Sequence, residues 1–243
     1  MEKEGISHIE VILAFILFIS FLFFAWYFFN PFHNTRLLDS SLSYATTSIV
    51  DNASVTLTTY AVKINESSTD SYIMINISGI PENMNVDVRN DSWDSIQSSR
   101  SGDDISILNA EIEGQSFKSG NAKIKDGDLL YIRFSEDFPA VDSFTGTWIK
   151  HEIASVTNER VISEKRILAL NRSYYLDLSD LKESFNLPSR IDFGFGLIFS
   201  ENDKITADTT VSKGLEVFSN SKRVEVLRID GKMQFADLMV RVW

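Results

Sequence analysis

Cysteine is absent from the 243 residues of this chain, and only three histidines are present. Without cysteine there is neither a disulfide framework nor thiolate chemistry, so the hydrophobic core alone must hold the fold. No two of the histidines, His8, His33 and His151, have the spacing of metal ligands, and a nucleophile elbow is also missing. We therefore expect neither an enzyme nor a cofactor or metal.

Basic residues are outnumbered as well. The chain has 23 Lys and Arg against 34 Asp and Glu, a net charge of −11. Such an acidic surface argues against nucleic acid as a partner. The N-terminus also lacks the basic region of a secretory signal, and no small-residue cleavage site follows the apolar stretch. The apolar stretch is therefore expected to stay in the mature protein.

That apolar stretch covers residues 11–29, and Ser20 is its only polar side chain before the aromatic tail. As a helix it would be about 28 Å long, against about 30 Å for the hydrocarbon core of a bilayer. The bulky aromatics from Trp26 onward suit a membrane–water interface. The sequence therefore predicts a transmembrane helix.

The residues before the helix carry a family resemblance. Gly5 before Ile6, Glu10 as the fifth residue after that junction, and an apolar helix that starts at once resemble the class III signal peptide of type IV pilins and pseudopilins, particularly archaeal ones. The resemblance implies that a prepilin peptidase cleaves between Gly5 and Ile6 on the cytoplasmic side. It also implies other pilin-like subunits and the pilus assembly machinery as partners. The leader departs from the family in having one base and two acids.

The chemistry of the motif centres on Glu10. Cleavage would make Ile6 a free α-ammonium inside a bundle of apolar helices, and an isolated buried ion is costly. In the family a carboxylate at this place sets the axial register during assembly, which implies the same role for Glu10. The alternative is a solvated acid that favours the helix dipole, on an uncleaved single-pass anchor that displays an adhesive or ligand-binding head.

These features divide the chain into four parts. They are a leader at residues 1–5, a transmembrane or filament-core helix at 6–30, a stalk at 31–53 and a β-rich extracellular domain at 54–243. In the stalk, apolar residues at helical spacing predict an amphipathic helix after a break at Pro31, whereas many Ser and Thr favour a loop. The apolar positions are Leu38, Leu42, Ala45 and Ile49.

The head has the pattern of a β domain, so the fold class is α+β with a mostly antiparallel sandwich or barrel. Strands are predicted at residues 55–62, 72–77, 85–88, 105–112, 129–134, 148–155, 160–169, 191–199, 222–229 and 232–243. Turns are expected at Asp126-Gly127-Asp128 and Asp230-Gly231, and a core role for Trp243.

Two local patterns interrupt the strands. Residues 177–185 offer an N-cap, apolar spacing and a stop at Pro188, which predicts a short helix. Gly194 and Gly196 alternate with Phe193 and Phe195, which favours a strand with one small and one large face over a phosphate loop.

The remaining candidates lie on the surface. The acidic turns Asp103-Asp104 and Glu201-Asn202-Asp203 offer oxygen ligands for Ca²⁺ but match no calcium loop, so solvated turns are the preferred interpretation. Five sequons would become N-glycosylation sites if the head is extracellular: Asn52, Asn65, Asn76, Asn90 and Asn171.

The sequence as a whole predicts a structural subunit of a type IV pilus-like surface filament or secretion pseudopilus. Its location would be the cytoplasmic membrane, with the C-terminal domain outside, or the extracellular filament. The large head favours a minor subunit.

Overall fold

The computed structural model describes residues 4–29, 32–109, 123–211 and 214–243. The helices are α1 (Glu4–Phe29), α2 (Phe32–Ala53), α3 (Glu164–Leu176) and α4 (Leu178–Ser184). The strands are β1 (Ser54–Ile64), β2 (Tyr72–Asn76), β3 (Asn85–Arg89), β4 (Ser95–Ile96), β5 (Ser98–Ser101), β6 (Asp104–Leu108), β7 (Leu129–Ser135), β8 (Thr147–Trp148), β9 (His151–Ser163), β10 (Phe193–Ile198), β11 (Lys204–Ala207), β12 (Phe218–Leu227) and β13 (Met233–Val242).

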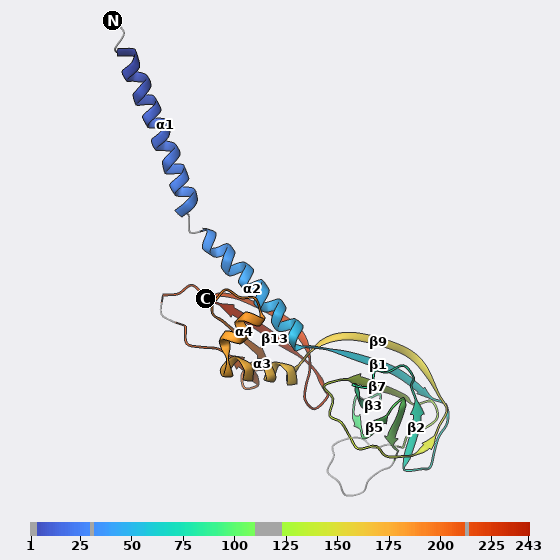
Figure 1. Ribbon diagram of the computed structural model, residues 1–243. Coiled ribbons are helices and arrows are strands. Elements are labelled where there is room, and N and C mark those ends of the chain that lie inside the picture. The colour runs from blue at the N-terminus through green and yellow to red at the C-terminus, as the bar shows by residue number, and fades with distance from the viewer. Residues whose placement is uncertain (1–3, 30–31, 110–122, 212–213) are drawn as a thin grey trace.

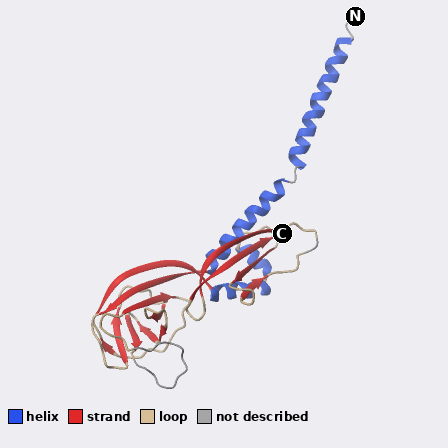
Figure 2. Ribbon diagram, turned by 180° about the vertical axis from the view of Figure 1, so that it is seen from behind, coloured by secondary structure: helices blue, strands red, loops and turns tan. Residues whose placement is uncertain are grey.

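Helix α1 projects away from the rest of the chain, and α2 leads from it into the head (Figure 1). The head has two lobes. The stalk lobe consists of α2, α3, α4 and the strands from β10 to β13, and the outer lobe consists of the strands from β1 to β9. Seen from behind, the helices of the head all lie at the stalk end, and strands and loops make up the outer lobe (Figure 2).

One nine-stranded sheet runs through both lobes in the order β11-β10-β13-β12-β9-β1-β7-β3-β4. A four-stranded sheet, β5-β6-β2-β8, packs on its outer-lobe part through buried Ile and Val side chains from both sheets. The outer lobe is therefore a sandwich. All described strand pairs are antiparallel except β2 with β8 and β9 with β12. This confirms the predicted α+β class with a mostly antiparallel sandwich head.

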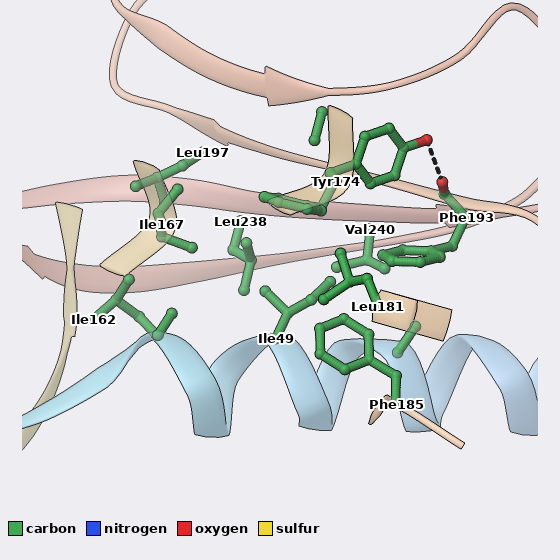
Figure 3. Packing of buried hydrophobic residues seen from close by; sticks show 14 of the residues in the cluster. Ile49, Ile162, Ile167, Tyr174, Leu181, Phe185, Phe193, Leu197, Leu238 and Val240 are labelled. Atoms are coloured by element: carbon green, nitrogen blue, oxygen red, sulfur yellow. Dashed lines mark hydrogen bonds between the residues drawn. The ribbon is translucent and has the colours of Figure 1, made fainter. Parts of the chain in front are cut away.

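Helix α2 supplies one wall of the stalk-lobe core. Its buried residues Ala45, Ile49 and Ala53 are fully enclosed, with Leu38 and Leu42 packed at the edge. Figure 3 shows Ile49 on α2 facing Leu238 of the sheet. The stalk is thus helical, and the loop interpretation is wrong. The helix accommodates its hydroxyl residues because they donate to carbonyls of the preceding turn, as Thr46 Oγ1 does to Leu42 O at 2.7 Å. Pro31 lies outside the described residues.

The predicted strand over 160–169 is wrong in its second half, since β9 ends at Ser163 and α3 begins at Glu164. Ser163 is the N-cap, and its hydroxyl accepts from Arg166 N. The acid of Glu164 in the first turn also favours a helix start. The apolar residues after Glu164 favoured a strand in the sequence analysis, but they belong to α3. Among the apolar residues of this helix only Ile167 and Tyr174 are buried.

The strand predicted over 148–155 is divided. Trp148 belongs to β8 in the four-stranded sheet, and β9 starts at His151 in the other sheet. Trp243 is partly exposed and lies outside the core cluster, so its predicted core role is also wrong. Its backbone instead pairs with Asp192 in both directions, at 2.9 and 3.0 Å. In the strand predicted over 105–112, β6 ends at Leu108, and residues 110–112 lie outside the described part.

The other local predictions are confirmed. Helix α4 is capped by Asp177, whose side chain accepts from Asp180 N. Gly127 and Gly231 lie in turns with φ of 92° and 77°, where glycine has no steric penalty. Strands β12 and β13 form the predicted C-terminal hairpin, and Gly194 and Gly196 lie on β10.

Candidate functional site: an apolar helix and a groove in the head

The first candidate site is the surface of α1. Residues Ile9–Tyr27 form a span of 19 residues with a mean hydropathy of 2.6, and none of it is buried against the head. The helix is therefore long and apolar enough to span a membrane. An apolar surface of this extent on all sides of a helix requires a lipid or protein environment.

The residues of the cleavage motif all lie on α1. Gly5 and Ile6 are in its first turn, and the side chain of Ile6 lies outside the described part of the structure. Glu10 follows one turn later and is exposed. Its carboxylate is therefore on the helix surface, where it can meet solvent or another helix.

The sequons differ in accessibility. Asn52, Asn65 and Asn76 are exposed, whereas Asn90 and Asn171 are partly buried. The Asn171 amide donates to Thr206 O at 2.8 Å, and Asn90 Oδ1 accepts from Asp94 N at 2.8 Å. The Asn52 and Asn76 amides also donate, to Ser48 O and to Asp104 Oδ1, each at 2.8 Å, so it is exposure alone that makes Asn52, Asn65 and Asn76 the more accessible acceptors for a glycan.

The acidic turns make structural bonds. Asp104 Oδ1 accepts from Asn76 Nδ2 at 2.8 Å, and Asp203 pairs with Arg228 at 3.0 Å. His151 Nε2 lies 3.1 Å from Asn76 O. Within the described ranges, no three His, Asp or Glu side chains come together in a way that could hold a metal ion.

The second candidate site is a groove of about 660 Å³ on the face of the nine-stranded sheet in the outer lobe. Its floor follows from strand register, because alternate residues point to the same face. Thr59 of β1 lies between Arg133 of β7 and Thr157 of β9. In the next row Ala61 lies between Tyr131 and Ser155, and Leu57 pairs with Glu159. Hydroxyl groups and apolar side chains thus share this floor.

Trp93 forms the rim of the groove beside Tyr131. The two rings are stacked, with centroids 5.0 Å apart and planes inclined by 11°. Trp93 has φ of 62°, in the left-handed region, which costs a bulky residue about 1–3 kcal/mol. The turn maintains this conformation, because Trp93 N donates to Asn90 O at 3.0 Å and Arg89 Nη1 donates to Trp93 O at 3.1 Å. The ring is therefore held in place although 52% of the residue is exposed.

Two buried arginines support the floor from β3 and β7. Arg89 and Arg133 both pair with Asp87, and Arg133 also donates to the carbonyl of Gly231 in the β12–β13 turn. Burial lowers the pKa of Arg133 from its ordinary value, while the charge of Asp87 and its hydrogen bond oppose that shift. Arginine still remains protonated. These bonds fix the turn of the C-terminal hairpin against the outer lobe.

The hairpin closes the other end of the groove through Glu225, Lys232 and Met233. Glu225 and Lys232 are exposed, and Lys232 Nζ lies 3.4 Å from Asp230 Oδ2. Burial acts to raise the pKa of Asp230, but the hydrogen bonds from Lys232 and the charges of Lys232 and Arg89 outweigh it, so that pKa is lowered overall.

Sequence reasoning missed this groove. Its residues come from six strands and two turns, and the hydrophobic pattern of a strand does not specify which other strands are its neighbours. One signal was available: Trp93 is an aromatic residue inside the polar segment Asn90-Asp91-Ser92-Trp93-Asp94. An aromatic side chain in a polar turn is unusual unless it binds or packs.

The fold and the exposed helix define an α+β chain with a β-rich head and a helix of membrane-spanning length. Comparison with protein-family models, with curated proteins and with solved structures gives no match.

Proposed function

We propose that this chain is a pilin-like structural subunit, of the minor kind, in a type IV pilus-like surface filament or a secretion pseudopilus. Assembly takes place through the N-terminal helix, with the head outside the membrane. The observation that carries this proposal is the exposed apolar span Ile9–Tyr27, joined to a second helix that is built into the head.

The stalk supports the proposal because it makes a mechanical connection. Helix α2 begins at Phe32 and contributes Ala45, Ile49 and Ala53 to the stalk-lobe core, so a force that reaches α2 acts on a helix packed into the head. A subunit held in a filament by its N-terminal helix needs such a connection.

The mechanism has three steps. Prepilin peptidase removes residues 1–5 and leaves Ile6 with a free α-ammonium. The helix from Ile6 to Phe29 then packs against those of neighbouring subunits. Glu10, exposed on α1, pairs with the α-ammonium of a neighbour, since a buried ammonium without a partner charge is strongly unfavourable.

The second candidate function is an uncleaved single-pass anchor that displays a ligand-binding or adhesive head. The groove beside Trp93 favours it, because a rigidly held, exposed aromatic ring in a concave surface is typical of binding sites. Both candidates share the same head, so the N-terminus distinguishes them.

The decisive measurement is the mass and N-terminal sequence of the protein isolated from membranes. The pilin-like proposal expects a mature chain that begins at Ile6, and the anchor expects Met1. Detection of Met1 alone would reject the pilin-like proposal.

Substitution of the residue before the junction tests the cleavage site. We expect Gly5→Val to block processing, because a peptidase that accepts a small side chain has no room for a branched one. The precursor would stay five residues longer and remain in the membrane, as intact mass would show. Gly5→Ala is the matched control and should be processed. Normal processing of the Val variant would contradict a cleavage site at Gly5.

A further inference from the structure

We propose that the groove beside Trp93 binds a neutral oligosaccharide. The proposal concerns only the head, so it holds whether residues 1–5 are removed or retained.

The aromatic rim supplies the first contact. One face of the Trp93 ring is stacked on Tyr131, the Arg133 guanidinium carbon lies 5.8 Å from the ring centroid, and 52% of the residue is exposed, so the indole still presents apolar ring surface to solvent. The axial C–H groups of a hexose ring form an apolar patch that matches such a face in size. Arg89 and the turn hold the backbone of Trp93, and the stack on Tyr131 orients its ring, so the ring loses little freedom on binding.

The floor supplies the second contact. The hydroxyl groups of Thr59, Ser155 and Thr157 lie on one face of two paired strands, next to the carboxylate of Glu159. Ser155, Thr157 and Glu159 are exposed. Hydroxyl and carboxylate groups in a row match the alternating donors and acceptors of sugar hydroxyls. The groove, of about 660 Å³, has room for more than one sugar ring.

The balance of charge selects a neutral ligand. Arg89 and Arg133 are engaged by Asp87, and Lys232 lies beside Asp230. The exposed charged side chains in the lining are Glu159, Glu225 and Lys232, so carboxylates outnumber the cation there. An acidic glycan would be repelled by these carboxylates. A polycation would meet Lys232 and the two arginines of the lining, Arg89 and Arg133.

The test uses the full chain in lipid nanodiscs, which avoid detergents with sugar headgroups. Saturation-transfer difference NMR would be recorded with maltohexaose, cellohexaose and mannohexaose, and with hexagalacturonate and oligolysine as charged probes. We expect saturation transfer to at least one neutral oligosaccharide, strongest at the axial C–H protons, and none to the charged probes.

Variants then locate the site. Trp93→Asn should weaken binding about tenfold or more, and asparagine tolerates the left-handed backbone of this position. Trp93→Phe should retain part of the affinity because it keeps a ring. Trp148→Ala is the matched control: Trp148 is 53% exposed but does not line the groove, so affinity should not change.

A second variant is independent of the strained turn. Thr157→Val keeps the shape of an exposed strand residue and removes one hydroxyl, so binding should weaken while the thermal midpoint stays the same. If Trp93→Asn fails to fold, the affinity of Thr157→Val decides whether the groove is the binding site.

Three outcomes would overturn the proposal. The first is no saturation transfer to any neutral oligosaccharide. The second is equal affinity in folded Trp93→Asn or Thr157→Val and in the parent. The third is binding of hexagalacturonate or oligolysine alone. None of these outcomes bears on the N-terminal sequence, so failure here and failure of the filament proposal are distinguishable.

Discussion

Asp87 pairs with both Arg89 and Arg133, and both arginine side chains are almost completely enclosed. Two buried cations near each other are tolerated because this anion pairs with both and because the carbonyls of Trp93, Asp230 and Gly231 accept further N–H groups from them. The cluster therefore depends on the charge of one side chain.

We expect Asp87→Asn to lower the free energy of unfolding by about 3–5 kcal/mol, since it keeps the shape but leaves two buried cations without a counter-charge. Urea unfolding followed by tryptophan fluorescence would measure the loss. Asp237→Asn is the control, because Asp237 and Arg223 form an exposed pair at 3.8 Å, worth about 1 kcal/mol at most. Equal losses in the two variants would contradict the role of Asp87.

Gly194 is required for a steric reason. A Cβ at this position would lie 2.7 Å from Asp208 Oδ1 and 3.0 Å from Ala207 O. Asp208 is held by an ion pair with Arg241, and Ala207 is backbone of the neighbouring strand, so neither can move aside easily.

Gly194→Ala should therefore destabilise the stalk lobe by about 1–3 kcal/mol, the usual cost of overpacking. Gly196→Ala is the matched control two residues along β10, where the nearest atom is the movable Thr206 Cγ2 at 3.3 Å. The thermal midpoint should fall more for the first variant. The same shift for both would show that the space around Gly194 is not limiting.

At the scale of elements, α2 is the part that connects the projecting helix to the head. Its buried face packs on α3, β12 and β13, and Ile49 in the middle of that face is completely enclosed. The packing of this one helix therefore decides how firmly α1 is attached.

Ile49→Ala should cost about 2–5 kcal/mol, because it removes buried methyl groups and leaves a cavity. Limited proteolysis would detect the loosened stalk, and urea unfolding would give the free energy. Tyr44→Ala on the same helix is the control, since Tyr44 is 63% exposed and should change stability by about 0.5 kcal/mol or less. Equal effects would contradict the packing of α2 as described.

At the scale of the whole molecule, the two lobes have separate main cores but share one sheet, and a small buried cluster of Val55, Leu57, Phe138, Val161 and Leu227 joins them. Strands β9 and β12 pair only at Val226 with Ile162 and at Leu227 with Ser163. The hydrogen bonds of Arg89 and Arg133 to the hairpin turn reinforce this junction. The groove lies beside it, so the position of its hairpin wall depends on the same contacts.

The electrostatic step of assembly is also a property of the whole molecule. Glu10→Gln keeps shape and hydrogen bonding but removes the charge, so membrane insertion should be unchanged. Incorporation into filaments should fall, because loss of a partner charge costs a buried ammonium about 3–5 kcal/mol. Co-purification with filament subunits would measure this.

Glu10→Asp, which keeps the charge, is the control and should assemble better than Glu10→Gln. For a plain anchor the acid is solvated, and both changes would alter stability by a few tenths of a kcal/mol at most. Normal co-purification of the Gln variant with normal processing at Gly5 would reject the pairing role and leave the cleavage proposal intact.

Much of the local structure could be predicted because its causes are local. The apolar span of α1 needs only length and hydropathy, the hairpin needs Asp230-Gly231 between two alternating strands, and α4 needs its Asp177 cap. The start of α3 was equally local, but its Ser163 cap was overlooked beside the apolar residues that follow.

Tertiary structure alone decided the rest. Strand alternation places Thr59 and Ala61 on one face, but it does not say that β7 and β9 are the neighbours of β1. Asp87, Arg133 and Gly231 are far apart in the sequence and meet only because the hairpin folds back on the outer lobe. Tertiary structure also decided between a helix and a loop for the stalk. Residues 32–53 have only a weak preference for a helix, and burial of one face of α2 against the sheet stabilises the helix. Local chemistry thus determined the elements, and long-range burial and pairing determined the groove.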